Sequence, residues 1–167
     1  SHDGGAQTLV IEKSSQFGGT SATSGGGVWI PNNRYAKAEN VDDSDQDARN
    51  YINSVSPEGM IKNDLIETYI SEGPRMIDYL HENSQVKYRN LAHYPDYFPD
   101  NAGGKEGNRS MEPEPIFGTE LGDDLGRLRE QHPQTAFTMG PINMNFTQVE
   151  GQLLLGALPG WKTQFAK

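Results

Sequence analysis

The residues best suited to chemistry lie near the N-terminus, where a short apolar run ends in an acidic residue and a glycine-rich loop follows. Residues 8–11 are apolar or branched, Glu12 comes next, and residues 14–33 are rich in Gly, Ser and Thr. The carboxylate of Glu12 can accept hydrogen bonds from both vicinal hydroxyls of a ribose. Glycines let the backbone approach a polyanion, and their amides, with the hydroxyls of Thr20 and Ser24, can donate to pyrophosphate oxygens. The segment therefore predicts contact with a dinucleotide.

Composition and charge limit the other kinds of site. The chain has 167 residues and a formal net charge of −9, and its Lys and Arg residues form no run, so we expect no nucleic-acid partner. It has no cysteine, which excludes thiolate chemistry, and its four histidines are spaced too widely for a metal site. No apolar run has the length of a membrane span, and no signal-peptide pattern opens the chain, so we expect a cytoplasmic protein.

Two helices are predicted after the loop. Ser44 opens the first as an N-cap, with Asp47 at the acidic position of a capping box, and the Ser-Pro pair at residues 56–57 ends it. The second covers residues 61–72, where apolar residues recur at helical spacing. Gly73-Pro74 is expected to kink or break this helix, because proline lacks the N–H donor and its ring clashes with the preceding turn.

The rest of the chain indicates short strands, one long loop and a further helix. Residues 8–11 are typical of a buried strand, and residues 86–88 alternate like a strand. Residues 91–118 are dense in Pro, Gly and aromatic residues and predict a long irregular segment, which in compact domains is often functional. A helix is predicted over Glu120–Gln131, with three leucines facing inward: Leu121, Leu125 and Leu128. This mixture indicates an α/β fold.

The glycine-rich loop also carries a family resemblance. Residues 12–31 fit the pattern E-K-x(4)-G-G-T-S-A-x-S-G-G-G-x-W-x-P at every fixed position. The run resembles the FAD-binding family of 3-ketosteroid dehydrogenases and fumarate-reductase-type flavoproteins, and its Thr-Ser-Ala and Trp-x-Pro elements favour the ketosteroid Δ1-dehydrogenase side. Residues 94–104 are similar to the family's aromatic D-Y-Y-P-E-x-x-G-G segment, with Phe98 and Asp100 where the family has Tyr and Glu.

The resemblance implies that FAD is the cofactor and assigns residues to it. Glu12 would bind the adenosine ribose, the middle of the loop would follow the pyrophosphate and ribityl chain, and its last glycines would approach the flavin ring. The implied cofactor-binding residues are Glu12, Lys13, Ser14, Gly19, Thr20, Ser21, Ala22, Ser24, Gly25, Gly26 and Gly27. The aromatic segment would supply a supporting active-site tyrosine, Tyr97 or else Tyr94, unless both only pack the loop against the body. Three further residues are expected to pack and not to catalyse: Phe17, Val28 and Trp29.

By the same resemblance, the fold is a partial Rossmann-like FAD-binding domain with a helical, loop-rich insertion. Residues 1–33 would be a remnant of the Rossmann unit, holding its second strand and the flavin loop. Residues 34–167 would continue the domain as helices and loops, without the catalytic domain. The Gly-x-Gly-x-x-Gly turn that should precede the second strand is not in the chain, so we expect a fragment. A missing neighbour strand leaves an apolar edge, and self-association is expected from it.

Three functions stay open. The parent protein would dehydrogenate an apolar, steroid-like ketone, with a base outside this chain taking a proton and the flavin accepting a hydride. A fumarate reductase or succinate dehydrogenase-like activity would instead act on a dicarboxylate and would need clustered Arg and His residues, whereas the arginines of this chain are scattered. The third alternative is a non-catalytic remnant with no activity of its own.

We predict that the chain by itself binds FAD weakly and shows no dehydrogenase turnover, because it lacks the glycine turn that faces the pyrophosphate. Titration calorimetry with FAD should give no binding at micromolar concentrations, and dye reduction with an androstenedione-like ketone should stay at background. Micromolar affinity or clear dye reduction would contradict this prediction.

Overall fold

The computed structural model describes residues 2–130, the strand residues 137–139 and 142–144, and the single positions 147, 150, 151, 159 and 162. The chain divides into two compact units. The first, here called the loop unit, comprises Ser1–Ser24 and Ile116–Met144. The second, here called the helical unit, comprises Gly25–Pro115 and Asn145–Lys167.

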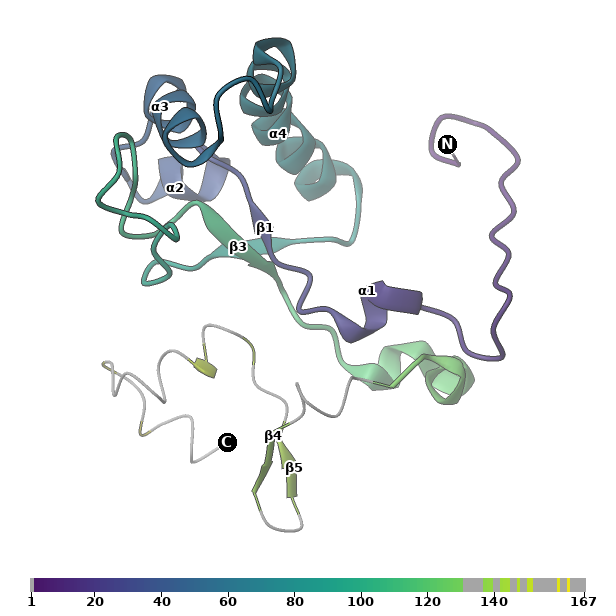
Figure 1. Cartoon of the computed structure of the whole chain (residues 1–167). Helices are drawn as coiled ribbons and strands as arrows, with labels where there is room; N and C mark the ends of the chain where they lie inside the picture. The colour runs from purple at the N-terminus through teal and green to yellow at the C-terminus, as the bar shows by residue number, and fades with distance from the viewer. Residues whose placement is uncertain are drawn as a thin grey trace. The chain divides into compact units, whose positions relative to one another are not determined.

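A small antiparallel sheet lies at the base of the helical unit (Figure 1). Its strand order is β1 (Val28–Trp29), β3 (Ser110–Pro113) and β2 (Tyr88–Asn90), so β3 is central. Val28 pairs with Met111, whose side chain is fully buried. The sheet is held together by contacts between segments far apart in the chain.

Two predictions about this region need correction. The middle strand β3 lies inside residues 91–118, which were predicted to be irregular throughout, and β2 begins two residues after the start of the strand predicted at 86–88. The sequence Ser-Met-Glu-Pro of β3 has no clear alternation. Its strand is stabilised by tertiary partners, including the ion pair between Arg89 and the buried carboxylate of Glu112, opposite each other on β2 and β3.

Three helices gather on one side of this sheet in Figure 1: α2 (Arg34–Ala38), α3 (Asp45–Val55) and α4 (Asn63–Asn83). The predicted first helix is confirmed as α3, and its N-cap is Ser44, whose hydroxyl accepts the amide of Asp47 at 3.1 Å. Apolar residues of α3 and α4 form one buried cluster: Ala48, Ile66 and Ile70. A second cluster joins α4 to the strands through Ile30, Ile77 and Met111.

Of the kink or break expected at Gly73-Pro74, the break is wrong, because α4 continues through Pro74 to Asn83. Proline removes only its own N–H, which leaves the carbonyl of Ile70 without its helical donor. The neighbouring glycine sits against the side chain of Ile30, where an added Cβ would lie 3.3 Å from Cδ1. Burial of Ile70 and Ile77 on either side of the proline stabilises the helix more than the single lost bond weakens it.

The loop unit contains short elements: α1 (Gly19–Thr23), the 3₁₀ segment η1 (Gly118–Arg127), and the antiparallel pair β4 (Phe137–Met139) and β5 (Ile142–Met144). The helix predicted over residues 120–131 is therefore a 3₁₀ segment, not a regular α-helix, where it is described. Gly122 interrupts η1 with φ +53° and ψ −128°, and none of its residues is buried, so an inward leucine face does not form.

The apolar residues 8–11 were predicted to form a buried strand, and this is wrong for the described structure. Leu9, Val10 and Ile11 are between 84% and 93% exposed, and the segment belongs to none of the described strands. A strand needs hydrogen-bonded neighbours on at least one edge, and the described residues supply none to this segment.

Among the described residues, no helix combines the length and the apolar character that crossing a lipid bilayer requires.

We predict that Gly103→Ala lowers the free energy of unfolding by about 3 kcal/mol, since it combines a left-handed backbone with severe overlap. Gly103 has φ +77°, and a Cβ there would lie 2.1 Å from the backbone carbonyl oxygen of Asp47 in α3. Gly59 has a similar φ of +73° with nothing within 4 Å, so Gly59→Ala isolates the backbone strain and should cost about 1 kcal/mol. Urea denaturation of both variants measures the difference, and equal losses would contradict the predicted overlap.

Candidate functional site

The predicted cofactor residues at the start of the loop lie at the surface of the loop unit. Glu12, Lys13 and Ser14 are all exposed. One carboxylate oxygen of Glu12 accepts the amide of Ser14 at 2.8 Å, which fixes a tight turn after the apolar run. The carboxylate is thereby held by its own backbone while it faces solvent.

Two glycines open the next part of the loop. Gly18 has φ +110°, and a Cβ there would lie 2.6 Å from Cβ of Ala22. This left-handed residue lets Ala22 donate its amide to the carbonyl of Gly18 at 3.0 Å, which starts α1. Gly19 has φ +52° with nothing within 4 Å of an added Cβ, and Thr20 and Ser21 are exposed. An open backbone with hydroxyl donors at the surface fits the contacts that a dinucleotide such as FAD needs.

The base of this loop is tied down by main-chain bonds. Phe17 donates its amide to the carbonyl of Arg127 at 2.9 Å, and its carbonyl accepts the amide of Arg129 at 2.9 Å. Phe17 and Leu128 thus form a parallel bridge. The pairing fixes the backbone of Phe17, and the packing of its side chain stays a prediction.

The last glycines of the predicted site belong to the helical unit. Gly26 has φ +68°, and a Cβ there would lie 2.9 Å from Cγ of Pro113, so the chain passes tightly against the end of β3. Gly27 follows at the mouth of a cleft in this unit.

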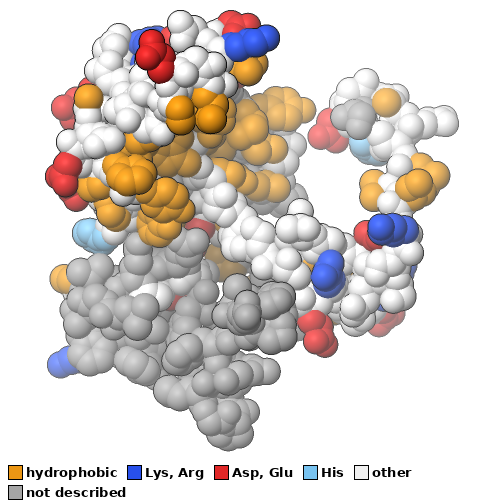
Figure 2. Space-filling view, in the orientation of Figure 1, with side chains coloured by type: hydrophobic (Ala, Val, Ile, Leu, Met, Phe, Trp, Pro, Cys, Tyr) orange, Lys and Arg blue, Asp and Glu red, His pale blue; other side chains and the backbone are white. Residues whose placement is uncertain are grey.

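The cleft has a volume of about 520 Å³, a size suited to a small organic ligand. Its walls come from Gly27 and β1, from the inner face of α3, and from the aromatic segment around residues 94–98. Most of the lining is apolar or aromatic, and none of the described lining residues is Lys, Arg or His. Figure 2 shows hydrophobic side chains gathered on this unit over α3, α4 and the strands. The structure therefore brings together three of the predicted site residues: Gly27, Tyr94 and Tyr97.

The two predicted site tyrosines, Tyr94 and Tyr97, differ in their surroundings. Tyr97 lies at the rim with 82% of its surface exposed. A side-chain hydrogen bond with Tyr97 raises the pKa of Tyr94, and burial raises it further. Both effects favour the protonated phenol of Tyr94.

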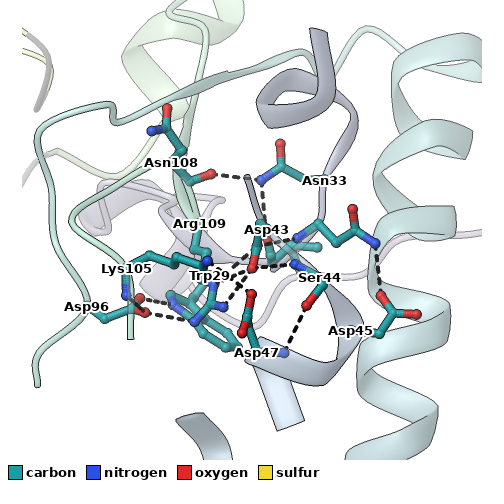
Figure 3. Close-up of polar contacts among 12 residues, drawn as sticks. Trp29, Asn33, Asp43, Ser44, Asp45, Asp47, Asp96, Lys105, Asn108 and Arg109 are labelled. Carbon is teal, nitrogen blue, oxygen red and sulfur yellow. Dashed lines mark hydrogen bonds and ion pairs between the residues drawn. The ribbon is translucent and has the colours of Figure 1, made fainter. Parts of the chain in front are cut away.

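Beneath the cleft lies a buried ionic network that was not predicted from the sequence (Figure 3). Arg109 is 1% exposed and points between two carboxylates, with Nη2 2.7 Å from Oδ1 of Asp43 and Nη1 2.8 Å from Oδ2 of Asp96. The side chains of Asp43 and Asp96 are themselves only 3% and 2% exposed. Asp96 belongs to the aromatic segment, whereas nothing local in the sequence marks Asp43 or Arg109 as its partners.

Trp29 connects this network to the cleft wall. Its indole Nε1 donates to Oδ1 of Asp96 at 2.6 Å, and its ring stacks on that of Tyr69 with centroids 6.3 Å apart. Tyr69 donates its hydroxyl to the carbonyl of Trp29, and burial raises the pKa of Tyr69. These contacts support the packing role predicted for Trp29.

The scattered arginines of the sequence have structural partners. Six of them form ion pairs with Asp or Glu: Arg34, Arg49, Arg75, Arg89, Arg109 and Arg127. None of these six lines the cleft. The cleft is therefore poorly suited to a dianionic ligand.

Comparisons with known proteins give concordant matches. A family profile described as FAD binding domain matches residues 1–156. A 3-oxosteroid 1-dehydrogenase of Mycolicibacterium smegmatis is 34% identical over 145 residues, which cover 87% of this chain and 25% of that protein. A 4-oxocyclohexanecarboxylate 2-dehydrogenase of Sinomonas cyclohexanicum is 33% identical over 135 residues, 81% of this chain and 23% of that protein.

A solved structure is similar over almost the whole chain. The crystal structure of 3-ketosteroid Δ1-dehydrogenase from Sterolibacterium denitrificans, in complex with 1,4-androstadiene-3,17-dione, superposes with a TM-score of 0.84 at 37% identity. The match covers 98% of this chain and 28% of that chain. The chain thus spans about a quarter of the length of the relatives it matches.

We predict that Tyr97→Phe lowers the pKa of Tyr94 toward 10.0, the ordinary value for tyrosine, because the hydrogen bond between the two side chains is the largest cause of the rise. Since the folded pKa is raised, the associated stability is present below pH 10.0 and is lost as pH rises through the folded pKa. Carbon-13 NMR of labelled tyrosine measures the midpoint. Tyr79→Phe, on the exposed face of α4, is the control that should leave it unchanged.

Proposed function

The chain belongs to the family of FAD-binding domains, and on that premise we propose that it is the cofactor-binding part of a dehydrogenase that acts on an apolar, steroid-like ketone. The observation that carries the proposal is the cleft in which Gly27 of the glycine loop meets Tyr94 and Tyr97. Its apolar lining suits a ring system. Two of the relatives are named for cyclic ketones, a 3-oxosteroid and 4-oxocyclohexanecarboxylate, which supports a ketone within a ring as the substrate.

FAD is the cofactor of this family, and it supplies the hydride acceptor when bound. We propose that the exposed carboxylate of Glu12 binds the ribose and that the open backbone at Gly19 approaches the pyrophosphate. The remaining proposed contacts run from the adenosine end to the flavin ring: Lys13, Ser14, Thr20, Ser21, Ala22, Ser24, Gly25, Gly26 and Gly27. Support comes from the exposure of the loop and from its left-handed glycines.

The reaction removes a proton from the carbon next to a ketone and a hydride from the adjacent carbon, which leaves a carbon–carbon double bond. In this proposal, Tyr94 and Tyr97 orient the ketone ring at the cleft rim, and neither takes the proton. The raised pKa of Tyr94 supports this role, since a phenol that stays protonated is a hydrogen-bond donor. The base would then come from outside the residues described.

We further propose that the exposed run Leu9–Ile11 becomes the second strand of a Rossmann-like sheet in the full-length protein. Three successive exposed apolar side chains suit a strand that is covered on both faces. Residues 1–33 would then be the Rossmann remnant and residues 34–167 its helical, loop-rich continuation. The same exposed run is the site at which self-association of the chain is expected. A cytoplasmic location stays a prediction.

We predict that the chain binds 1,4-androstadiene-3,17-dione in the cleft and does not bind succinate, because the lining is apolar and its described residues include no cation. The indole N–H signal of Trp29 in proton–nitrogen NMR reports binding, since this residue lines the cleft. Ile61→Asp should weaken binding about tenfold or more by placing a charge in the lining.

Leu65→Asp is the matched control for this titration, because Leu65 is an exposed apolar residue of the same region that does not line the cleft. It should leave ketone binding unchanged. A response to succinate alone would favour a fumarate reductase-like site. A lack of response to both ligands would favour the non-catalytic reading.

A further inference from the structure

We propose that Arg109 is a positioning residue for the cleft: its buried guanidinium fixes Asp96 and thereby holds the Tyr94–Tyr97 pair at the rim. The inference deepens the proposed function and rests on it, because the pair matters for catalysis only if the cleft binds a ketone. Arg109 does not itself line the cleft.

The guanidinium is anchored first to the residue pair that precedes α3. Its Nε lies 3.3 Å and 3.1 Å from the two carboxylate oxygens of Asp43, and Nη2 donates to Oδ1 at 2.7 Å. Asp43 also accepts the amides of Asn32 at 2.7 Å and Ser44 at 2.9 Å. These bonds orient the guanidinium plane, so the remaining nitrogen, Nη1, has a defined direction.

Nη1 donates to Oδ2 of Asp96 at 2.8 Å, and this contact reaches the tyrosines through the backbone. Asp96 stands between Tyr94 and Tyr97 in the chain. Its carboxylate also accepts Nε1 of Trp29 at 2.6 Å and the amide of Lys105 at 3.0 Å, and its own amide donates to the carbonyl of Lys105 at 2.9 Å. These four hydrogen bonds of Asp96 restrict the backbone of the residues on either side of it.

The guanidinium of Arg109 also contacts two aromatic rings, and one of them supports the backbone just after Tyr97. The guanidinium carbon lies 5.4 Å from the ring centroid of Trp29 and 5.7 Å from that of Tyr51. The hydroxyl of Tyr51 accepts the amide of Phe98 at 3.3 Å, directly after Tyr97. Arg109 therefore supports the aromatic segment both before and after Tyr97.

Lysine is the substitution that separates charge from geometry at this position. Arg109→Lys keeps a cation beside the two buried carboxylates, but its single ammonium cannot reproduce the planar fork that bonds Asp43 and Asp96 together. The matched control is Arg89→Lys, because Arg89 pairs with the buried carboxylate of Glu112 on the same sheet and does not line the cleft.

The test uses the 167-residue chain and three readouts: thermal unfolding, the titration midpoint of Tyr94 by carbon-13 NMR, and affinity for 1,4-androstadiene-3,17-dione. Both variants should unfold at lower temperature. Only Arg109→Lys should move the Tyr94 midpoint toward 10.0 and weaken ketone binding about tenfold. An unchanged midpoint in folded Arg109→Lys, or an equal shift in Arg89→Lys, overturns the positioning role.

Failure of the proposed function can be told apart from failure of the positioning role of Arg109. If the wild-type chain binds no ketone, the Tyr94 midpoint still reports whether Arg109 positions the pair. If Arg109→Lys does not fold, Trp29→Phe removes one donor to Asp96 and leaves the guanidinium in place. That variant should shift the midpoint in the same direction by a smaller amount, and a midpoint equal to that of the wild type overturns the proposal.

Discussion

The helical unit depends on one buried cation and the two carboxylates that neutralise it. Arg109 stands directly before β3, and its carbonyl accepts the amide of Ile30 at 2.8 Å, so its backbone belongs to the sheet while its side chain reaches Asp43 and Asp96. A charge taken out of water is tolerated only with its partners in place. The strands, the start of α3 and the aromatic segment are therefore constrained together, and the cleft walls follow from that constraint.

The glycine-rich loop depends on the absence of side chains, not on a buried charge and its partners. Gly18 and Gly19 both have left-handed backbones, and at Gly19 nothing lies within 4 Å of an added Cβ. At Gly26 the missing side chain serves packing instead, because Pro113 occupies the space a Cβ would take. One run of glycines thus meets two different physical requirements, a left-handed turn into α1 in its first half and close approach to β3 in its second.

The charge of the cleft lining bears on which of the family's substrate classes the cleft suits. Flavoproteins that share this sequence pattern act on steroids or on dicarboxylates. These two substrate classes differ in charge, so the charge of the residues that line the substrate site distinguishes between them. Six arginines of the described chain form ion pairs with carboxylates and none of these six lines the cleft. Asp96 is the acidic residue among the described lining, and its carboxylate is bonded to Trp29, Arg109 and Lys105. What faces the cleft is mostly hydrocarbon and aromatic surface, with phenol groups at the rim.

Local sequence determined the features that depend on neighbours in the chain. The N-cap at Ser44 and the helix it starts were predictable because capping involves residues three apart, and the loop pattern of residues 12–31 identified the family. Tertiary structure decided the rest. β3, the passage of α4 through Pro74 and the exposure of residues 8–11 all depend on whether distant segments supply partners. The pairing of Arg109 with Asp43, 66 residues away, leaves no local trace, because the free energy of a buried ion pair depends on the dielectric and geometry that only the folded chain creates.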